Sequence, residues 1–326
     1  MSGSLRDAIF AIDDPTVPWS ARTSAAAGFW PPLKGGPTIS LREMTRRFAP
    51  SGAALRNLAD GGADVWGHID RSAVVRQVRD RLRDPGVMSQ KPTDLCGPFS
   101  MVVELARRRP VEYVNWANEL LTAGTLATPS RTIEAEDDLR ERPVPQGQLT
   151  DVDWLFTATI RDDENVFEDV DDGEGLEGMT LWGAMQGWTD DLLGLRPAWE
   201  SCFHSGELDA LMAAQAAIDA GGVAFLLIDA NLLKDGGDDD EEDMYWQAAA
   251  HTPHQPVGGL GSRKHSEDDA FPPDHWVVYL GELNPRNPSE DDQVTLKLWS
   301  WGREYVVSGN CDSFGEYLYG VVTGTP

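Results

Sequence analysis

Residues 96–109 have the sequence CGPFSMVVELARRR, in which a turn, an apolar run and a basic end follow one another. The arginines suit the negative end of a helix dipole, and Pro110 cannot continue a helix. We therefore expect a helix that begins at Cys96, directly at the Cys-Gly-Pro turn. Because apolar residues occupy nearly all of its sides, this helix is expected to be buried.

Helices are predicted on both sides of this segment. Residues 71–83 carry valine and leucine at helical spacing, with Asp70 as an N-cap and a Pro-Gly stop signal after them. Two further helices are expected over 111–122 and 179–193. The acidic stretch between them, 134–172, is predicted to form mostly loops.

Beyond Pro197 the pattern changes from helices toward strands. Residues 207–220 are predicted as a helix that a glycine pair closes, and residues 223–228 as a buried strand. Two more strands are expected at 276–280 and 294–299, where apolar and aromatic residues cluster or alternate.

The order of these elements, helices first and strands second, predicts an α+β fold. Residues 1–60 are rich in Pro, Gly, Ala and Ser, and we expect them to form an irregular N-terminal arm. Residues 61–197 would then form a helical part, and residues 198–326 a β-rich part.

The chain is strongly acidic. It has 27 Lys and Arg against 54 Asp and Glu, which gives a formal net charge of −27. Such a surface repels nucleic acids and anionic membranes, so neither is expected as a partner. The longest apolar stretch, residues 223–233, is shorter than the ~20 residues of a membrane-spanning helix. The N-terminus has no apolar leader, so synthesis in the cytoplasm without a secretory signal is expected.

Cys96 and His275 are the candidates for nucleophilic catalysis. Cys96 opens a helix, whose N-terminal partial positive charge stabilises a thiolate, whereas Cys202 and Cys311 have no such setting. His275 directly precedes a strong strand, and a rigid strand positions a base well. Three cysteines without a CxxC pair are too few for a disulfide framework and lack the spacing of a zinc ribbon.

Neither a metal ion nor another cofactor is expected. His251 and His254 have an HxxH spacing, but no helix and no third ligand accompany them. The acidic run 235–243 lacks the ligand rhythm of a calcium loop and is predicted to be a solvated loop. Since this run precedes His275, it could border the site and favour basic substrates.

Four short motifs resemble, in their order along the chain, those of the papain-like cysteine proteases. A Gln lies six residues before the Cys, and a glycine-led apolar strand follows. A His then opens a strand, and a last strand ends in a Trp-rich tetrapeptide. The motifs are QKPTDLCGPFS at 90–100, GGVAFLLIDA at 221–230, DHWVV at 274–278 and WSWG at 299–302. The resemblance implies a two-lobed fold, with the Cys on a helical lobe and the His on an antiparallel β lobe.

The resemblance also implies roles for individual residues. Cys96 would be the nucleophile, and His275 would be its base and then the acid toward the leaving group. Gln90 would donate its side-chain amide to the oxyanion, beside the backbone N–H of Cys96. Removing such a donor typically costs ~10²–10³ in rate.

The third catalytic residue stays open. The family's Asn, which orients the His, falls on Trp299, and an indole cannot accept an imidazole N–H in the same way. Ser300 could replace it after a shift of one position, although the strand pleat puts Ser300 on the opposite face from Trp299. Asn284, Asn287 or a Cys–His dyad are the alternatives. Trp301 matches the family's Trp that shields the His contact.

These roles imply a cysteine peptidase that forms an acyl-enzyme at Cys96 and acts on a protein or peptide. The motifs resemble those of papain-like domains in bacterial polymorphic toxins and type VI secretion effectors. That resemblance implies a toxin that a dedicated apparatus delivers and that an immunity protein neutralises. Two alternatives remain. A transglutaminase, glutamine deamidase or peptidoglycan amidase uses the same Cys–His pair, and a chain that has lost its third residue would serve only as a binding module.

Overall fold

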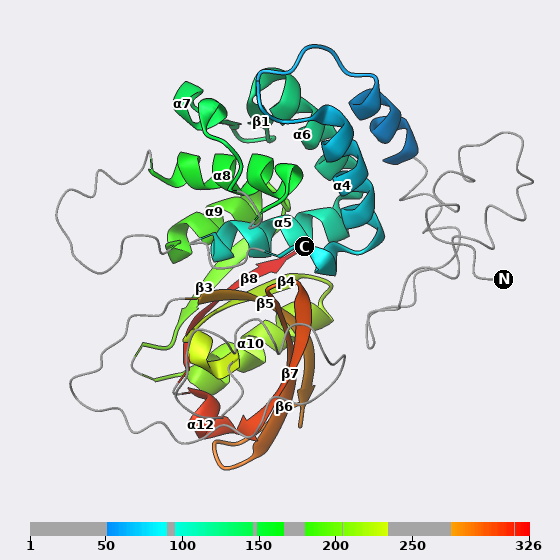
Figure 1. The fold of residues 1–326 in the computed structure, drawn as a ribbon. Helices are drawn as coiled ribbons and strands as arrows, with labels where there is room; N and C mark the ends of the chain where they lie inside the picture. The colour runs from blue at the N-terminus through cyan, green and yellow to red at the C-terminus, as the bar shows by residue number, and fades with distance from the viewer. Residues whose placement is uncertain are drawn as a thin grey trace, which may run out of the picture. The chain divides into compact units, whose positions relative to one another are not determined.

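The structure, a computed structural model, describes residues 51–89, 95–145, 149–165, 180–203, 205–233, 275–315 and 317–326 (Figure 1). It contains α-helices and two antiparallel sheets, which confirms the predicted α+β class. The chain divides into two compact units, one of Met1–Pro92 and Val102–Asp169, the other of Thr93–Met101 and Val170–Pro326. No helix in the described ranges is both long enough and apolar enough to cross a membrane.

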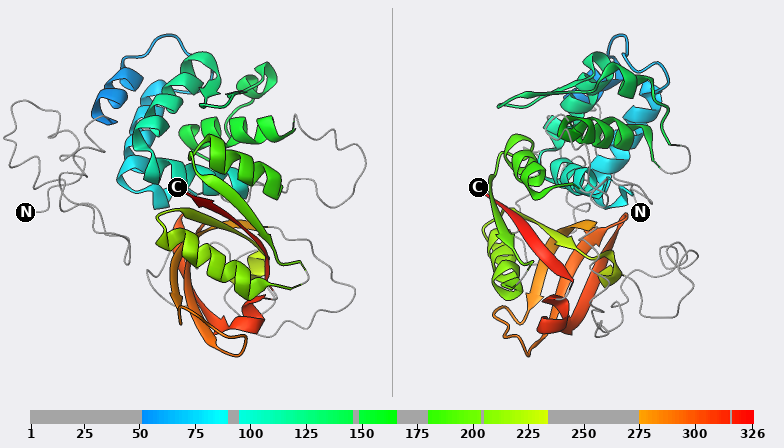
Figure 2. Two further views of the ribbon diagram at one scale, coloured as in Figure 1. Left: turned by 180° about the vertical axis from the view of Figure 1, so that it is seen from behind. Right: turned by 90° about the vertical axis from the view of Figure 1, so that its left-hand side faces the viewer.

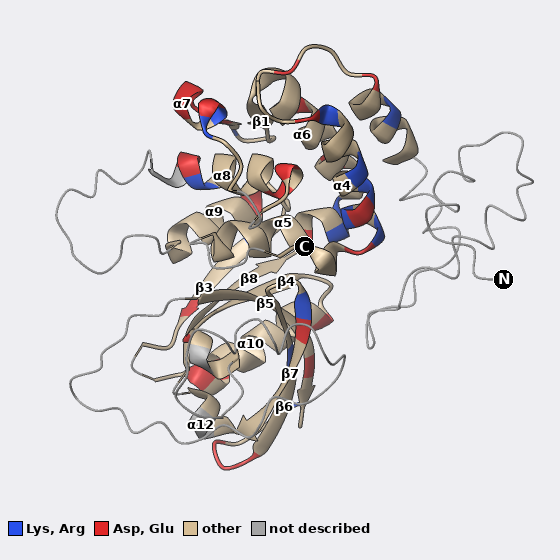
Figure 3. Cartoon of the chain, viewed as in Figure 1, with Lys and Arg blue, Asp and Glu red and all other residues tan. Residues whose placement is uncertain are grey.

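The first unit consists mainly of helices. Its elements are α4 (Arg71–Arg83), η1 (Pro85–Val87), α6 (Pro110–Ala123), β1 (Thr125–Ala127), β2 (Thr132–Glu134), α7 (Asp137–Glu141) and α8 (Asp151–Asn165). The predicted cap of α4 is confirmed, since the Asp70 carboxylate accepts a hydrogen bond from the Ser72 N–H. The buried stripe of α4 packs on α6 and α8. Figure 3 shows both basic and acidic residues on α4.

Two predictions for this unit are wrong. Residues 51–59 are helical rather than irregular, and the stretch 134–172 contains α8 rather than mostly loops. The middle of α8 is apolar or threonine, and its acidic residues lie toward the two ends. Asp153, near its start, can be buried because Arg81 donates two hydrogen bonds to it, of 3.2 and 2.5 Å. The many Asp and Glu residues of the segment led to the prediction of loops, although the middle of α8 has a helical pattern.

We predict that Asp153→Ala destabilises the protein by roughly 3–5 kcal/mol, because it leaves the buried Arg81 guanidinium without its carboxylate. Urea unfolding followed by circular dichroism measures the loss. As a control, Asp138→Ala removes an exposed pair with Arg142 and should cost less than ~1 kcal/mol. Equal losses in the two variants would contradict this view of α8.

α5 (Cys96–Arg108) belongs to both units, because its residues up to Met101 group with the second unit and the rest with the first. The helix begins at Cys96, as predicted. Glu104 is fully buried and forms ion pairs with Arg107 and Arg108 of the same helix. The two arginines at the end of α5 therefore neutralise its buried carboxylate.

The second unit contains a six-stranded antiparallel sheet with the strand order β3-β8-β4-β5-β6-β7, whose strands are labelled in Figure 1. The strands are β3 (Arg196–Ser201), β4 (Val223–Ile228), β5 (His275–Asn284), β6 (Gln293–Ser300), β7 (Arg303–Asn310) and β8 (Leu318–Thr325). The helices are α9 (Trp182–Asp191), α10 (Glu207–Asp219) and α12 (Cys311–Gly315), with a short turn η2 (Ala230–Leu233). The predicted helices and strands after residue 179 all form, whereas β3, β7 and β8 were not predicted.

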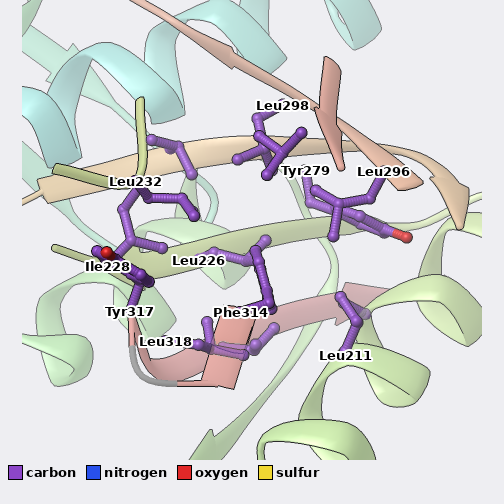
Figure 4. Packing of buried hydrophobic residues seen from close by; sticks show 14 of the residues in the cluster. Leu211, Leu226, Ile228, Leu232, Tyr279, Leu296, Leu298, Phe314, Tyr317 and Leu318 are labelled. Carbon is purple, nitrogen blue, oxygen red and sulfur yellow. The ribbon is translucent and has the colours of Figure 1, made fainter. Parts of the chain in front are cut away.

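The core of this unit lies where α10 packs against the sheet (Figures 2 and 4). β4 is buried at every position, as its uninterrupted apolar sequence predicts. Gln215 of α10 accepts hydrogen bonds from the Tyr279 hydroxyl at 2.7 Å and from the Leu283 N–H at 3.1 Å. This polar link anchors β5, the strand that His275 opens.

Candidate active site

His275 lies at the end of the sheet where β4 and β6 terminate. Its side chain is 3% exposed, and its Nε2 lies 2.7 Å from the hydroxyl oxygen of Ser300, the last residue of β6. A serine hydroxyl can accept from an imidazole N–H or donate to an unprotonated nitrogen, so it can orient the ring in either tautomer. The structure therefore brings together two of the residues that the sequence singled out.

The register between β5 and β6 explains why Ser300, and not Trp299, contacts the histidine. Val278 lies opposite Trp299, so these two side chains share one face of the sheet. Side chains alternate between the faces along each strand, which places His275 and Ser300 together on the other face. The indole of Trp299 therefore points away from the imidazole.

The alternative partners Asn284 and Asn287 lie far from His275. Asn284 is the last residue of β5, nine positions after His275, so at most roughly 30 Å of strand separates them, less the shortening caused by the irregular register near Gly281. Asn287 follows in the connection to β6. Of the candidates for a third residue, Ser300 is thus the one that reaches the ring.

Trp301 covers the imidazole. The two rings stack with centroids 4.5 Å apart and 20° between their planes. Trp301 and Gly302 form the two-residue loop between β6 and β7, and their φ angles are 46° and 79°. Positive φ at both positions is typical of a type I′ hairpin turn, which glycine accepts easily but which costs other residues about 1–2 kcal/mol. Strain of this kind is retained mainly at functional positions.

Burial keeps the imidazole neutral. Removal from water lowers the pKa of His275 from its ordinary 6.5 to about 3. At pH 7 the ring is therefore a proton acceptor, and an ion pair formed in advance with a thiolate is disfavoured.

Cys96 is the first residue of α5, and its side chain is 4% exposed. Four residues later, ~6 Å along the axis, the Ser100 hydroxyl donates a hydrogen bond of 3.2 Å to the carbonyl of Trp276. Trp276 directly follows His275 in β5. This contact lies within the second unit and joins the turn that carries the cysteine to the strand that carries the histidine.

A second contact holds the same turn. Gly97 packs so closely on Thr180 that a Cβ at position 97 would lie 2.6 Å from its hydroxyl oxygen. The Trp276 indole N–H in turn donates to the Thr180 carbonyl at 2.8 Å. Only glycine therefore fits at the second position of α5 without displacing the helix start.

The prediction that Cys311, like Cys202, opens no helix is wrong, because Cys311 is the first residue of the five-residue helix α12; Cys202 has no helix start. Burial raises the pKa of the Cys202 thiol to about 12, and the negative charges of Glu207 and Glu200 add to this effect. Cys311 is buried at the start of the short helix α12. None of the three cysteines forms a disulfide. Cys96 is therefore the cysteine whose helix turn is tied to the histidine strand.

Several sequence predictions concern residues outside the described ranges. These are Gln90, His251, His254 and the acidic run 235–243. Within the described ranges, no three His, Cys, Asp or Glu side chains gather as a metal site requires. Ser100 and Thr180 were not predicted as parts of the site. The spacing of four between Cys96 and Ser100, on one helix face, was a signal for the first, and nothing in the sequence pointed to the second.

Comparison of the chain with protein-family models, with curated proteins and with solved structures gives no match. Any function assigned to the chain therefore depends on the geometry of this site and on the motif resemblance.

We predict that His275 makes stability sensitive to acid. Its pKa is about 3 when folded and near 6.5 when unfolded, so below pH 6.5 protons bind preferentially to the unfolded chain. This residue alone should lower the free energy of unfolding by up to ~1.4 kcal/mol per pH unit as the pH falls toward 3. Urea unfolding at neutral and at mildly acidic pH, compared with His275→Asn, isolates this contribution because both proteins share their carboxylates. An identical pH dependence would exclude a buried neutral imidazole.

Proposed function

We propose that the protein is a cysteine hydrolase of papain-like type, a peptidase in its simplest form, that reacts through Cys96. The observation that carries the proposal is the setting of His275, which Ser300 contacts at Nε2 and which Trp301 covers. The first turn of the Cys96 helix is tied to the same strand end. These contacts support the roles that the motif resemblance implies, with Ser300 in place of the family's Asn.

In the proposed reaction, His275 accepts the thiol proton of Cys96 at Nδ1, because Nε2 faces Ser300. The sulfur attacks the substrate carbonyl carbon, and the backbone N–H of Cys96, at the helix N-terminus, donates to the oxyanion. His275 then gives its proton to the leaving amine nitrogen, and water hydrolyses the thioester. The Gln90 amide would be a second oxyanion donor.

Both reacting side chains are buried, with 4% of Cys96 and 3% of His275 exposed. A substrate therefore reaches them only after covering residues move, and proton transfer accompanies the attack rather than preceding it. The same burial favours, as a second candidate, a protein of this fold that binds a partner without reacting with it.

The proposed substrate is a protein or peptide, and the net charge of −27 supports a basic one. A bacterial toxin, delivered by type VI secretion and paired with an immunity protein, is proposed from the motif resemblance alone. Transglutaminase, deamidase and amidase chemistry would use the same Cys–His pair. Mass spectrometry of treated substrates separates a cleaved backbone from a converted glutamine or a cross-link.

We predict that iodoacetamide alkylates Cys96 at least ~10-fold faster than Cys202 or Cys311, because His275 on the neighbouring strand takes the thiol proton as the sulfur attacks. Peptide mapping by mass spectrometry measures the three rates in one sample. His275→Ala should slow the alkylation of Cys96 and leave the other two rates unchanged. If Cys96 reacts no faster than the other cysteines, the binding-module candidate replaces the hydrolase.

Ser300→Ala is expected to lower the turnover of a general protein substrate such as casein by roughly 10- to 100-fold, since a misoriented base loses much of its catalytic contribution. Ser300→Asn, which offers the family's residue on the correct face, should recover part of the loss. Thr295→Ala is the control, because Thr295 lies on the same strand and bonds Ser308 instead. Full activity in Ser300→Ala would remove Ser300 from the site.

A further inference from the structure

Exposed aromatic side chains gather beside β3, at one edge of the sheet. Trp182 of α9 and Phe203, just after β3, are 38% and 42% exposed, and their rings lie 6.2 Å apart. Trp182 stacks on Trp199 of β3 at 5.5 Å, and Phe203 lies 5.7 Å from Tyr319 of β8. In the described ranges the other large exposed apolar residues are two valines in the first unit. A clustered aromatic patch of this kind marks a contact with a ligand or partner.

The backbone of β3 also offers hydrogen-bonding groups on its outer side. β3 ends the strand order, so among the described strands β8 is its one neighbour. The Cys202 N–H donates to the Tyr319 carbonyl in continuation of the β3–β8 register, so the even-numbered residues of β3 bond to β8. Trp199 and Ser201 therefore direct their N–H and C=O outward. Pro197, which has no N–H, occupies the same kind of position, as edge prolines do.

This edge is continuous with the candidate active site inside the second unit. The ring of Trp199 lies 6.2 Å from that of Trp276, the residue after His275. Ser201 lies opposite Gly320 of β8, which lies opposite Leu227 of β4. Leu227 in turn lies opposite Trp276 of β5, so Ser201 and Trp276 are at the same level of the sheet, three strands apart. Three strand spacings amount to roughly 14 Å, which about four residues of an extended peptide span.

We propose that β3 is a docking edge for the substrate, where an extended peptide segment pairs with the backbone of Trp199 and Ser201 as an added strand. One of its aromatic or apolar side chains would lie on the patch formed by Trp182, Trp199 and Phe203. The inference rests on the proposed function and deepens it, because it names a recognition segment separate from the bond that is cleaved.

An exposed acidic residue beside this edge indicates which side chains the bound peptide segment carries. Glu200 is exposed and lies on the opposite face of β3 from Trp199. Successive side chains of an added strand alternate between the same two faces, so the residue next to the aromatic one faces Glu200. The fitting segment therefore alternates aromatic or apolar residues with basic ones. Stacked tryptophans also suit sugar rings, but a glycan needs no backbone N–H from Ser201.

The test measures binding of fluorescein-labelled Lys-Phe-Lys-Val-Lys-Phe-Lys to the full-length Cys96→Ala protein by fluorescence anisotropy. Ser201→Pro removes one outward N–H, at the kind of position that Pro197 already fills, and should weaken binding at least ~10-fold. Trp182→Ala should weaken it similarly. Ala198→Ser is the matched control, since the Ala198 backbone bonds to β8, and it should bind like the parent.

Peptides N-methylated at alternate residues make the test independent of whether Ser201→Pro folds. One methylation register should abolish binding and the other should preserve it, because an added strand pairs along one side only. Unchanged binding in Ser201→Pro, or equal binding of both methylated peptides, overturns the proposal. Binding of chitohexaose that needs Trp182 but tolerates Ser201→Pro replaces it with a glycan site. The proposed function has a separate readout, the alkylation rate of Cys96 in the parent chain, and slow alkylation there would contradict it. Ser201→Pro should leave this rate unchanged, so the two failures are distinguishable.

Discussion

The hydrogen bond from the Ser100 hydroxyl to the Trp276 carbonyl is the interaction on which the candidate site depends, because it joins segments 176 positions apart in the chain. It holds the first turn of α5 against the start of β5. Because Gly97 has no side chain, the same turn also packs closely on Thr180. These contacts tie the helix turn that carries Cys96 to the strand that carries His275. A site of this kind exists only when the sheet and the helix start have both formed.

The second constraint is the hairpin turn that carries Trp301. An Asn-Gly pair would form this turn with less strain, yet it would leave the imidazole of His275 uncovered. The stack on His275 and the edge contact with Tyr305, at 6.2 Å, help to offset the cost of the positive φ. The chain thus gives up some hairpin stability to keep the imidazole dry and neutral, a trade that is typical of functional positions.

Features that depend on local sequence were predictable. Helix spacing and caps predicted α4 and the start of α5, and an uninterrupted apolar run predicted β4. Features that depend on distant partners were not. β8 contains Gly320, which leaves room for the ring of Trp199, and no periodicity signals such packing. The choice of Ser300 over Trp299 follows from the register with β5, which the sequence of β6 alone does not determine.

The most direct test of the site is ¹⁵N NMR of the imidazole of His275 at pH 7, in the parent protein and in Cys96→Ala. We predict a neutral ring that is protonated at Nε2, whose Nδ1 resonance shifts when the thiol is removed while Nε2 stays near its position. A charged imidazolium at neutral pH, or an Nδ1 chemical shift that is the same in the parent protein and in Cys96→Ala, would contradict the account.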